Sequence, residues 1–136
     1  MDREEIKKII PHREPMLLVD EAILIDESTA KGKYTVKGDE WFLQGHFPGN
    51  PVVPGVILCE IMAQTCSVIL ADKVKGKTPF FTGLNNVKFK NQVKPGDVLD
   101  IEGKITRMRG SFCFGEAVGS VDGKVSVVAE FSFAII

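Results

Sequence analysis

The sequence lacks most of the short motifs by which enzymes are recognised. It holds no glycine-rich phosphate-binding loop and no G-x-S-x-G motif around a nucleophilic serine. Its three cysteines, Cys59, Cys66 and Cys113, do not have the spacing of metal ligands, and two of them fall in one apolar stretch. We therefore predict no metal site, no nucleotide-binding loop, and reduced cysteines that are buried as small apolar side chains.

The sequence also has almost no charge bias. Its 136 residues include 17 basic and 18 acidic side chains, for a formal net charge of −1. So small a net charge indicates neither nucleic acid nor a membrane surface as a partner, and an electrostatic partner would have to recognise a local patch. The N-terminal MDREEIKKII mixes both signs and is no signal peptide, which together with reduced cysteines predicts a cytoplasmic protein. The length predicts a single domain, residues 1–136.

One long apolar run is present, at residues 55–71, GVILCEIMAQTCSVILA. It is short for a membrane span, which needs about 20 apolar residues, and it carries Glu60 near its middle. We therefore predict no membrane insertion and a helix that is buried on nearly all sides, over about residues 54–74. Pro54 suits the first position of such a helix because its missing N–H has no partner to lose there.

The rest of the chain predicts a sheet. A short amphipathic helix is expected at residues 2–9, and Asp39–Leu43 could form one helical turn. Strands are expected, from apolar runs or alternation, at residues 16–25, 31–37, 87–90, 98–108, 112–121 and 124–135, with a hairpin at Asp122-Gly123. The economical fold is α+β: a curved antiparallel sheet of about six strands wrapped around the buried helix. Because such a sheet leaves an edge open, self-association as a two-fold dimer is expected.

Four groups could carry chemistry. On the buried helix, Glu60, Gln64 and Ser67 share one stripe, which is either a structural network or a line facing a polar site. His46 lies in the Pro/Gly-rich loop 45–54 before the helix, and could pair with Glu60 as general base and acid or serve as a structural residue.

The third group is the start of the buried helix. The N–H groups of Gly55 and Val56 have no partner within the helix, so they could polarise a carbonyl or simply bind water. The fourth is a basic set in the second half of the chain, which is either a solvated strand face or a surface for an anionic partner. Its members are Lys88, Lys90, Lys94, Lys104, Arg107 and Arg109.

These residues form a recognisable combination. Gly45-His46-Phe47-Pro48-Gly49, then Pro54-Gly55-Val56-Ile57, then Glu60 and Met62-Ala63-Gln64 resemble the 3-hydroxyacyl-[acyl-carrier-protein] dehydratases of type II fatty acid synthesis. The resemblance extends over essentially the whole chain, with Pro11-His12-Arg13 and Leu17-Leu18-Val19-Asp20 near its start and Pro95-Gly96-Asp97 later. It departs at Trp41, Leu43, Cys59 and Ile61, none of which replaces a catalytic group.

The resemblance implies a hot-dog fold and a reaction without a cofactor. Water would leave a (3R)-3-hydroxyacyl thioester on acyl carrier protein, giving the trans-2-enoyl thioester. His46 would take the proton at C2, Glu60 of a second subunit would act at the 3-hydroxyl, Gln64 would orient Glu60, and the Gly55 N–H would hold the carbonyl. The family forms homodimers, commonly three of them in a hexamer, and the acidic carrier protein would bind the basic set.

Three alternatives remain at this stage. The first is a bifunctional enzyme that also isomerises the trans-2 to the cis-3 double bond, although that sister family typically has Asp in place of Glu60. The second is a hot-dog acyl thioesterase, and the third is a non-catalytic module that binds acyl carrier protein. The sequence assigns no role to His12 or to the cysteines.

Overall fold

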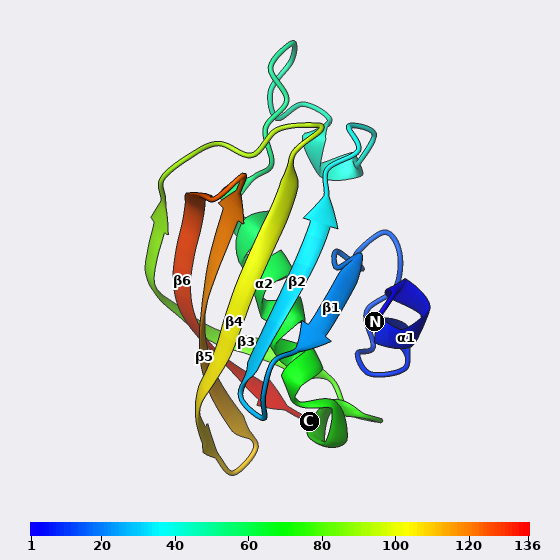
Figure 1. Cartoon of the computed structure of the whole chain (residues 1–136), viewed down its shortest axis with the longest axis vertical. Coiled ribbons are helices and arrows are strands. Elements are labelled where there is room, and N and C mark those ends of the chain that lie inside the picture. Colours follow the sequence, from blue (N-terminus) through cyan, green and yellow to red (C-terminus); the bar gives the residue numbers. More distant parts are fainter.

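The computed structural model describes residues 1–136 as a curved antiparallel sheet around one long helix (Figure 1). The sheet has six strands in the order β1-β2-β4-β5-β6-β3, and every neighbouring pair is antiparallel. The strands are β1 (Glu21–Leu24), β2 (Thr29–Thr35), β3 (Pro79–Phe89), β4 (Val98–Arg109), β5 (Phe112–Val121) and β6 (Lys124–Ile135). The helical elements are α1 (Arg3–Lys7), the 3-10 turn η1 (Trp41–Leu43), α2 (Gly55–Ile69) and α3 (Ala71–Val74). This is the architecture predicted from the sequence.

Helix α2 is the predicted buried helix, and it begins directly after Pro54. Strands β1, β2, β4, β5 and β6 all contact it. Glycines let the sheet approach closely: a Cβ on Gly103 would lie 2.5 Å from Cys66 Sγ, and one on Gly32 would lie 2.8 Å from Thr65 Oγ1. The predicted helix of about residues 54–74 is not continuous, because it breaks at Leu70, whose N–H bonds Ser67 before α3 begins.

The predicted strand over residues 16–25 is wrong in its first half, since β1 begins at Glu21. Leu17, Leu18 and Val19 are all buried, so the segment lacks the alternation of a strand at a sheet surface. The backbone N–H groups of Leu17 and Leu18 do not bond a neighbouring strand. The Leu17 N–H donates to Arg13 O, and the Leu18 N–H donates to the Gln64 side chain.

Other predictions differ mainly in their limits. Helix α1 is shorter than the predicted 2–9, and its start is held by a capping box between Asp2 and Glu5. Strand β3 starts at Pro79, well before the alternating residues 87–90 that predicted it. The hairpin at Asp122-Gly123 is confirmed, with φ of 51° and 80° as a primed turn requires.

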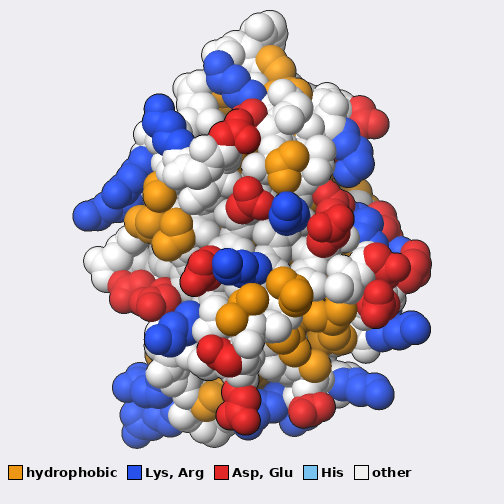
Figure 2. Space-filling model, in the orientation of Figure 1, with side chains coloured by type: hydrophobic (Ala, Val, Ile, Leu, Met, Phe, Trp, Pro, Cys, Tyr) orange, Lys and Arg blue, Asp and Glu red, His pale blue; other side chains and the backbone are white.

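The two faces of the sheet differ in chemistry. The inner face packs on α2, while the outer face pairs charges across strands, as in the contact of Lys33 with Asp100 at 3.7 Å. Figure 2 shows basic and acidic side chains interspersed over one side of the molecule. Strand β3 lies at the edge of the sheet and has only one neighbour, β6, so its other edge is open. No helix in the structure has both the length and the apolarity needed to cross a bilayer.

Candidate active site

The loop that carries His46 has a defined shape. The His46 N–H bonds the carbonyl of Leu43 at the end of η1, and the His46 carbonyl accepts the N–H of Val52 at 2.9 Å. Between them, Phe47 and Asn50 exchange two backbone hydrogen bonds of 3.0 and 2.9 Å. The loop is therefore closed on itself, which fixes the position from which the His46 side chain projects.

The His46 ring is oriented by this same loop. Its Nδ1 lies 3.0 Å from the carbonyl oxygen of Val52, and the ring stacks on Phe47 at 4.2 Å. Because a carbonyl oxygen can only accept, this contact places the ring proton on Nδ1. Nε2 then keeps its lone pair, which is the state that a general base requires.

The start of α2 offers free backbone donors. Ile57 and Leu58 donate their N–H groups to Pro54 O, whereas the N–H groups of Gly55 and Val56 make no backbone hydrogen bond. The ring of Phe89 lies against the helix start, and a Cβ on Gly55 would be 2.7 Å from Phe89 Cζ. A side chain at Gly55 would therefore have to displace the Phe89 ring, which is half exposed.

The Glu60 carboxylate is held by the side-chain amide of Gln64, whose nitrogen and oxygen are both hydrogen-bonded. Gln64, whose side chain is 1% exposed, donates from Nε2 to Glu60 Oε2 at 2.8 Å and to Met16 O at 2.7 Å. Its Oε1 accepts the N–H of Leu18 at 2.8 Å. The predicted stripe is confirmed: Glu60, Gln64 and Ser67 line one hollow, in which Gln64 bonds Glu60 and the Ser67 hydroxyl bonds the helix's own carbonyl at Ala63.

Within one chain the histidine beside Glu60 is His12. Its Nε2 lies 3.4 Å from Glu60 Oε2, and no contact within 4.0 Å joins Glu60 to His46. The two lie in a small hollow with Gln64 and the start of β3, lined by His12, Glu60, Ala63, Gln64, Ser67, Pro79, Phe81 and Phe133. Sequence reasoning found no role for His12, since its proximity to Glu60 depends on how residues 11–20 pack against α2.

The basic residues predicted to bind a partner do not form one patch. Lys88, Lys90 and Lys104 lie on the outer sheet face among acidic side chains such as Glu116 and Glu130. Arg107 and Arg109 lie near the other end of β4, where Arg107 covers the ring of Phe114 at 4.3 Å. Lys94 lies in the loop before β4, in a turn closed by its N–H bond to Asp97. The set is thus divided among three places.

The three cysteines are free and buried, as predicted. Burial raises the pKa of Cys59 and of Cys66, and it raises that of Cys113 to about 11. Thiols held protonated in this way are poor nucleophiles. The structure brings together no three His, Cys, Asp or Glu side chains that could hold a metal ion.

Comparisons with known proteins give one consistent answer. The FabA-like domain family matches residues 10–130. The chain is 49% identical over 137 residues to the 3-hydroxyacyl-[acyl-carrier-protein] dehydratase FabZ of Clostridium perfringens, covering 99% of each chain. It is 50% identical over 135 residues to FabZ of Caldicellulosiruptor bescii, covering 97% of this chain and 96% of the relative.

Solved structures show the fold. The dehydratase heterocomplex ApeI:P from Xenorhabdus doucetiae aligns with a TM-score of 0.82 at 24% identity, over 95% of this chain and 89% of that one. The E. coli PaaI protein aligns with a TM-score of 0.66 at 14% identity, over 84% and 81%. The predicted hot-dog fold is confirmed, and the chain belongs to the FabA-like family, among the FabZ 3-hydroxyacyl-[acyl-carrier-protein] dehydratases, as its resemblance predicted.

Proposed function

We propose that this chain is a hydro-lyase that removes water from (3R)-3-hydroxyacyl-acyl carrier protein and gives the trans-2-enoyl thioester, in fatty acid elongation. The predicted dehydratase function agrees with the family that the comparisons give. The observation in the structure that carries the proposal is on α2, where free N–H groups at Gly55 and Val56 precede a carboxylate that Gln64 holds in place. Dehydration needs a donor for the thioester carbonyl and an acid for the 3-hydroxyl, and α2 supplies both types of group.

Each step of the elimination has a group to perform it. The Gly55 N–H donates to the thioester carbonyl and stabilises the negative charge that develops there. Nε2 of His46 takes the proton from C2, while Nδ1 stays bonded to Val52 O. Glu60 gives its proton to the 3-hydroxyl, so that the C3–O bond breaks and water leaves. Glu60 ends as a carboxylate and His46 as an imidazolium, and one proton returned from His46 to Glu60 restores both.

We propose that His46 and Glu60 of one site come from two copies of the chain, as the resemblance implies, and within one chain Glu60 faces His12 and not His46. The open edge of β3 supports a dimer, since an unpaired edge with apolar side chains is a pairing surface. Phe80 and Leu84 on this strand are 53% and 44% exposed. The trimer of dimers and the cytoplasmic location stay predictions.

For the carrier protein, we propose Lys94, in the loop between β3 and β4, as the first contact among the predicted basic residues. The segment that leads to it lies beside the start of α2: the Phe89 ring lies against Gly55, and the Val93 carbonyl accepts the N–H of Val53 at 2.8 Å. An anionic carrier docked there would deliver its thioester close to the proposed carbonyl site. Arg107 and Arg109 are predicted partners at a greater distance along β4.

The test is product analysis with (3R)-3-hydroxyacyl-acyl carrier protein, by intact mass and double-bond position. Loss of water to the trans-2 product alone supports the proposal. A cis-3 product would show the bifunctional isomerase, a free acid the thioesterase, and an unchanged substrate that still binds would show the non-catalytic module.

A mixing experiment tests whether the site is shared. We expect His46→Gln and Glu60→Gln to be inactive separately but to recover on subunit exchange. Half of the randomly formed dimers are then mixed, and one of their two sites has both intact residues, so about a quarter of the wild-type activity should return. The control is His46→Gln mixed with the double variant, which should recover nothing. No recovery after exchange verified by native mass spectrometry would contradict shared sites.

A further inference from the structure

We propose that His12 is a positioning residue for Glu60: its Nε2 lies against Oε2 of the carboxyl group and, with Gln64, directs Oε1 toward the substrate. This inference rests on the proposed catalytic role of Glu60. The observation behind it is the short distance from His12 Nε2 to Glu60 Oε2, 3.4 Å, in a hollow that both residues line.

The surroundings of the ring select one tautomer. Nδ1 of His12 is buried and has no hydrogen-bond partner in the structure. A proton on Nδ1 would be a buried donor without an acceptor, which is costly, whereas a lone pair there loses less. The proton therefore belongs on Nε2, the nitrogen that faces the Glu60 carboxyl.

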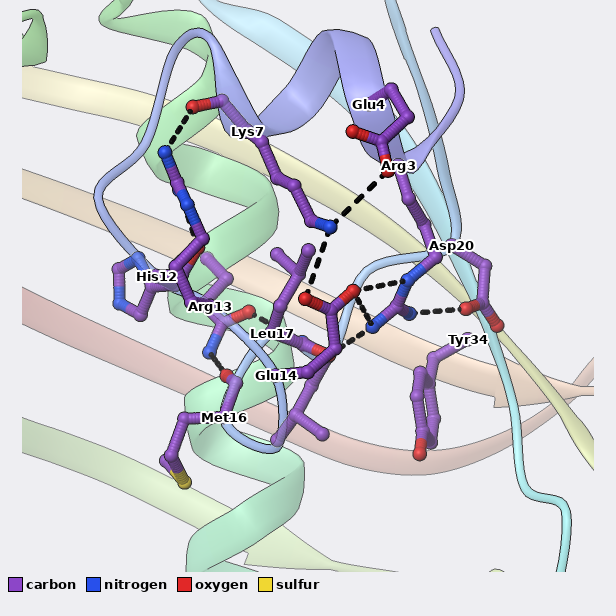
Figure 3. Close-up of polar contacts among 12 residues, drawn as sticks. Arg3, Glu4, Lys7, His12, Arg13, Glu14, Met16, Leu17, Asp20 and Tyr34 are labelled. Atoms are coloured by element: carbon purple, nitrogen blue, oxygen red, sulfur yellow. Dashed lines mark hydrogen bonds and ion pairs between the residues drawn. The ribbon is translucent and has the colours of Figure 1, made fainter.

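His12 is held in this place from its own segment. The guanidinium of Arg13 donates to the carbonyls of Ile10 at 3.0 Å, His12 at 2.7 Å and Lys7 at 3.0 Å. Figure 3 shows Arg13 turned back toward α1, with the His12 ring on the side of α2. The backbone on either side of the ring is thus fixed, which leaves only the side-chain torsions of His12 to direct the ring.

A network of charges ties the same segment to α1. Glu14 contacts Lys7 at 3.0 Å and Arg3 at 3.3 Å, and Arg3 contacts Asp20 at 2.6 Å (Figure 3). Hydrogen bonds from its own backbone N–H and from Lys7 hold the pKa of Glu14 at about 2. From the opposite side, Gln64 bonds the carbonyl of Met16. Residues 12–20 are therefore clamped between α1 and α2.

The consequence for Glu60 is an asymmetric carboxyl group. Oε2 faces two nitrogen atoms, Gln64 Nε2 at 2.8 Å and His12 Nε2 at 3.4 Å. Oε1 has no hydrogen-bond partner in the chain, so it is the oxygen left to exchange a proton with the substrate hydroxyl. Two directions of approach to Oε2 fix the plane of the carboxyl group, which a single contact cannot do.

A matched pair of variants tests the role. In His12→Gln the amide nitrogen can occupy the place of Nε2, and His12→Met has the same length without a donor. We expect the Met variant to lower kcat about tenfold or more with KM nearly unchanged, and the Gln variant to recover most of the loss. A Met variant that folds and keeps kcat within about twofold, or a Gln variant no better than Met, would overturn the proposal.

A measurement on the unmodified protein covers the case in which the variants do not fold. The chain has two histidines, so its imidazole 15N spectrum is simple. We expect His12 as the Nε2–H tautomer and His46 as the Nδ1–H tautomer, with the His12 Nε2–H signal shifting in Glu60→Gln. An Nδ1–H tautomer for His12, or no response to Glu60→Gln, would overturn the positioning role. This readout needs no turnover, so it stays separate from a failure of the proposed dehydration.

Discussion

Replacing Gln64 by Met would remove every hydrogen bond of this side chain while keeping its length. The amide donates to Glu60 Oε2 and Met16 O and accepts from Leu18 N–H, all between 2.7 and 2.8 Å. After the change, the Leu18 N–H is left without an acceptor beneath a side chain that is 2% exposed. Met16 and Glu60 both reach the surface, so water can replace the lost donor for each of them.

The loss of stability depends on whether water can replace each lost hydrogen bond. A buried donor left unpaired costs about 1–3 kcal/mol, and the two lost donors that water can replace add about 1 kcal/mol between them. We therefore expect Gln64→Met to destabilise the protein by about 2–4 kcal/mol, which corresponds to a fall in Tm of roughly 10 °C for a chain of this size. Activity should fall about 10- to 100-fold, since Glu60 loses its closest donor.

The assay is denaturant unfolding at fixed protein concentration, together with turnover at a temperature where the variant is folded. The control is Thr65→Val, on the same helix and equally buried, whose hydroxyl bonds only the Ile61 carbonyl one turn back. Because that carbonyl also lies within the helix ladder, we expect a loss below about 0.5 kcal/mol. If Gln64→Met is no less stable than Thr65→Val, the amide is not what joins residues 16–18 to α2.

Three further predictions concern the start of α2, the Glu14 carboxylate and the docking of the carrier protein. Gly55→Ala should abolish most activity, measured as kcat/KM, because its Cβ would lie 2.7 Å from Phe89 Cζ. Phe89→Leu should restore part of that activity in the double variant, and a double variant no better than Gly55→Ala would show that the clash with Phe89 is not the cause. The folded pKa of Glu14 is about 2 against its usual 4.5, so its contribution is complete above about pH 4.5 and disappears as pH falls toward 2. Amide hydrogen exchange of the first twenty residues should therefore lose protection at low pH. In Glu14→Gln the same loss of protection should appear already at pH 7. Lys94→Glu should raise KM for the carrier-protein substrate about fivefold at low salt but not KM for a short soluble thioester; an equal effect on both would argue against docking.

The sequence predicted the parts of the fold that depend on local pattern. The apolar run after Pro54 becomes α2, since a helix without a polar face can only be buried. Asp122-Gly123 becomes a hairpin turn because its positive φ values suit those two residue types. The stripe of Glu60 and Gln64 also follows from helical periodicity alone, as residues four apart face the same way.

The segment of residues 16–20 could not be predicted, for a physical reason. Leu17 and Leu18 suggest a strand by composition, yet their N–H groups bond Arg13 O and the Gln64 side chain instead of a neighbouring strand. Such a segment is shaped by contacts distant in sequence, which no local pattern encodes. The position of His12 beside Glu60 depends on these contacts, and so it too was inaccessible from the sequence.

The two histidines show why residue type alone does not give a role. A histidine in sequence is equally a donor, an acceptor or a base, and only its partners decide between them. The Val52 carbonyl keeps the proton of His46 on Nδ1, which frees Nε2 as a base. A buried Nδ1 without a partner keeps the proton of His12 on Nε2, the nitrogen that lies on the side of Glu60.

The helix start has features that the folding of one chain does not explain. Val56 is 71% exposed, and Phe89, whose ring lies against Gly55, is 54% exposed, so two large apolar side chains lie beside free N–H groups. Apolar surface left in water contributes nothing to the stability of the fold, and an unpaired donor contributes nothing either. Covering this region with an acyl thioester and a second copy of the protein would stabilise both features. The acyl chain and the second copy would bury the apolar side chains, and the thioester carbonyl would accept a hydrogen bond from the free N–H. The surface that is unfavourable in one chain is therefore the part best suited to the proposed site.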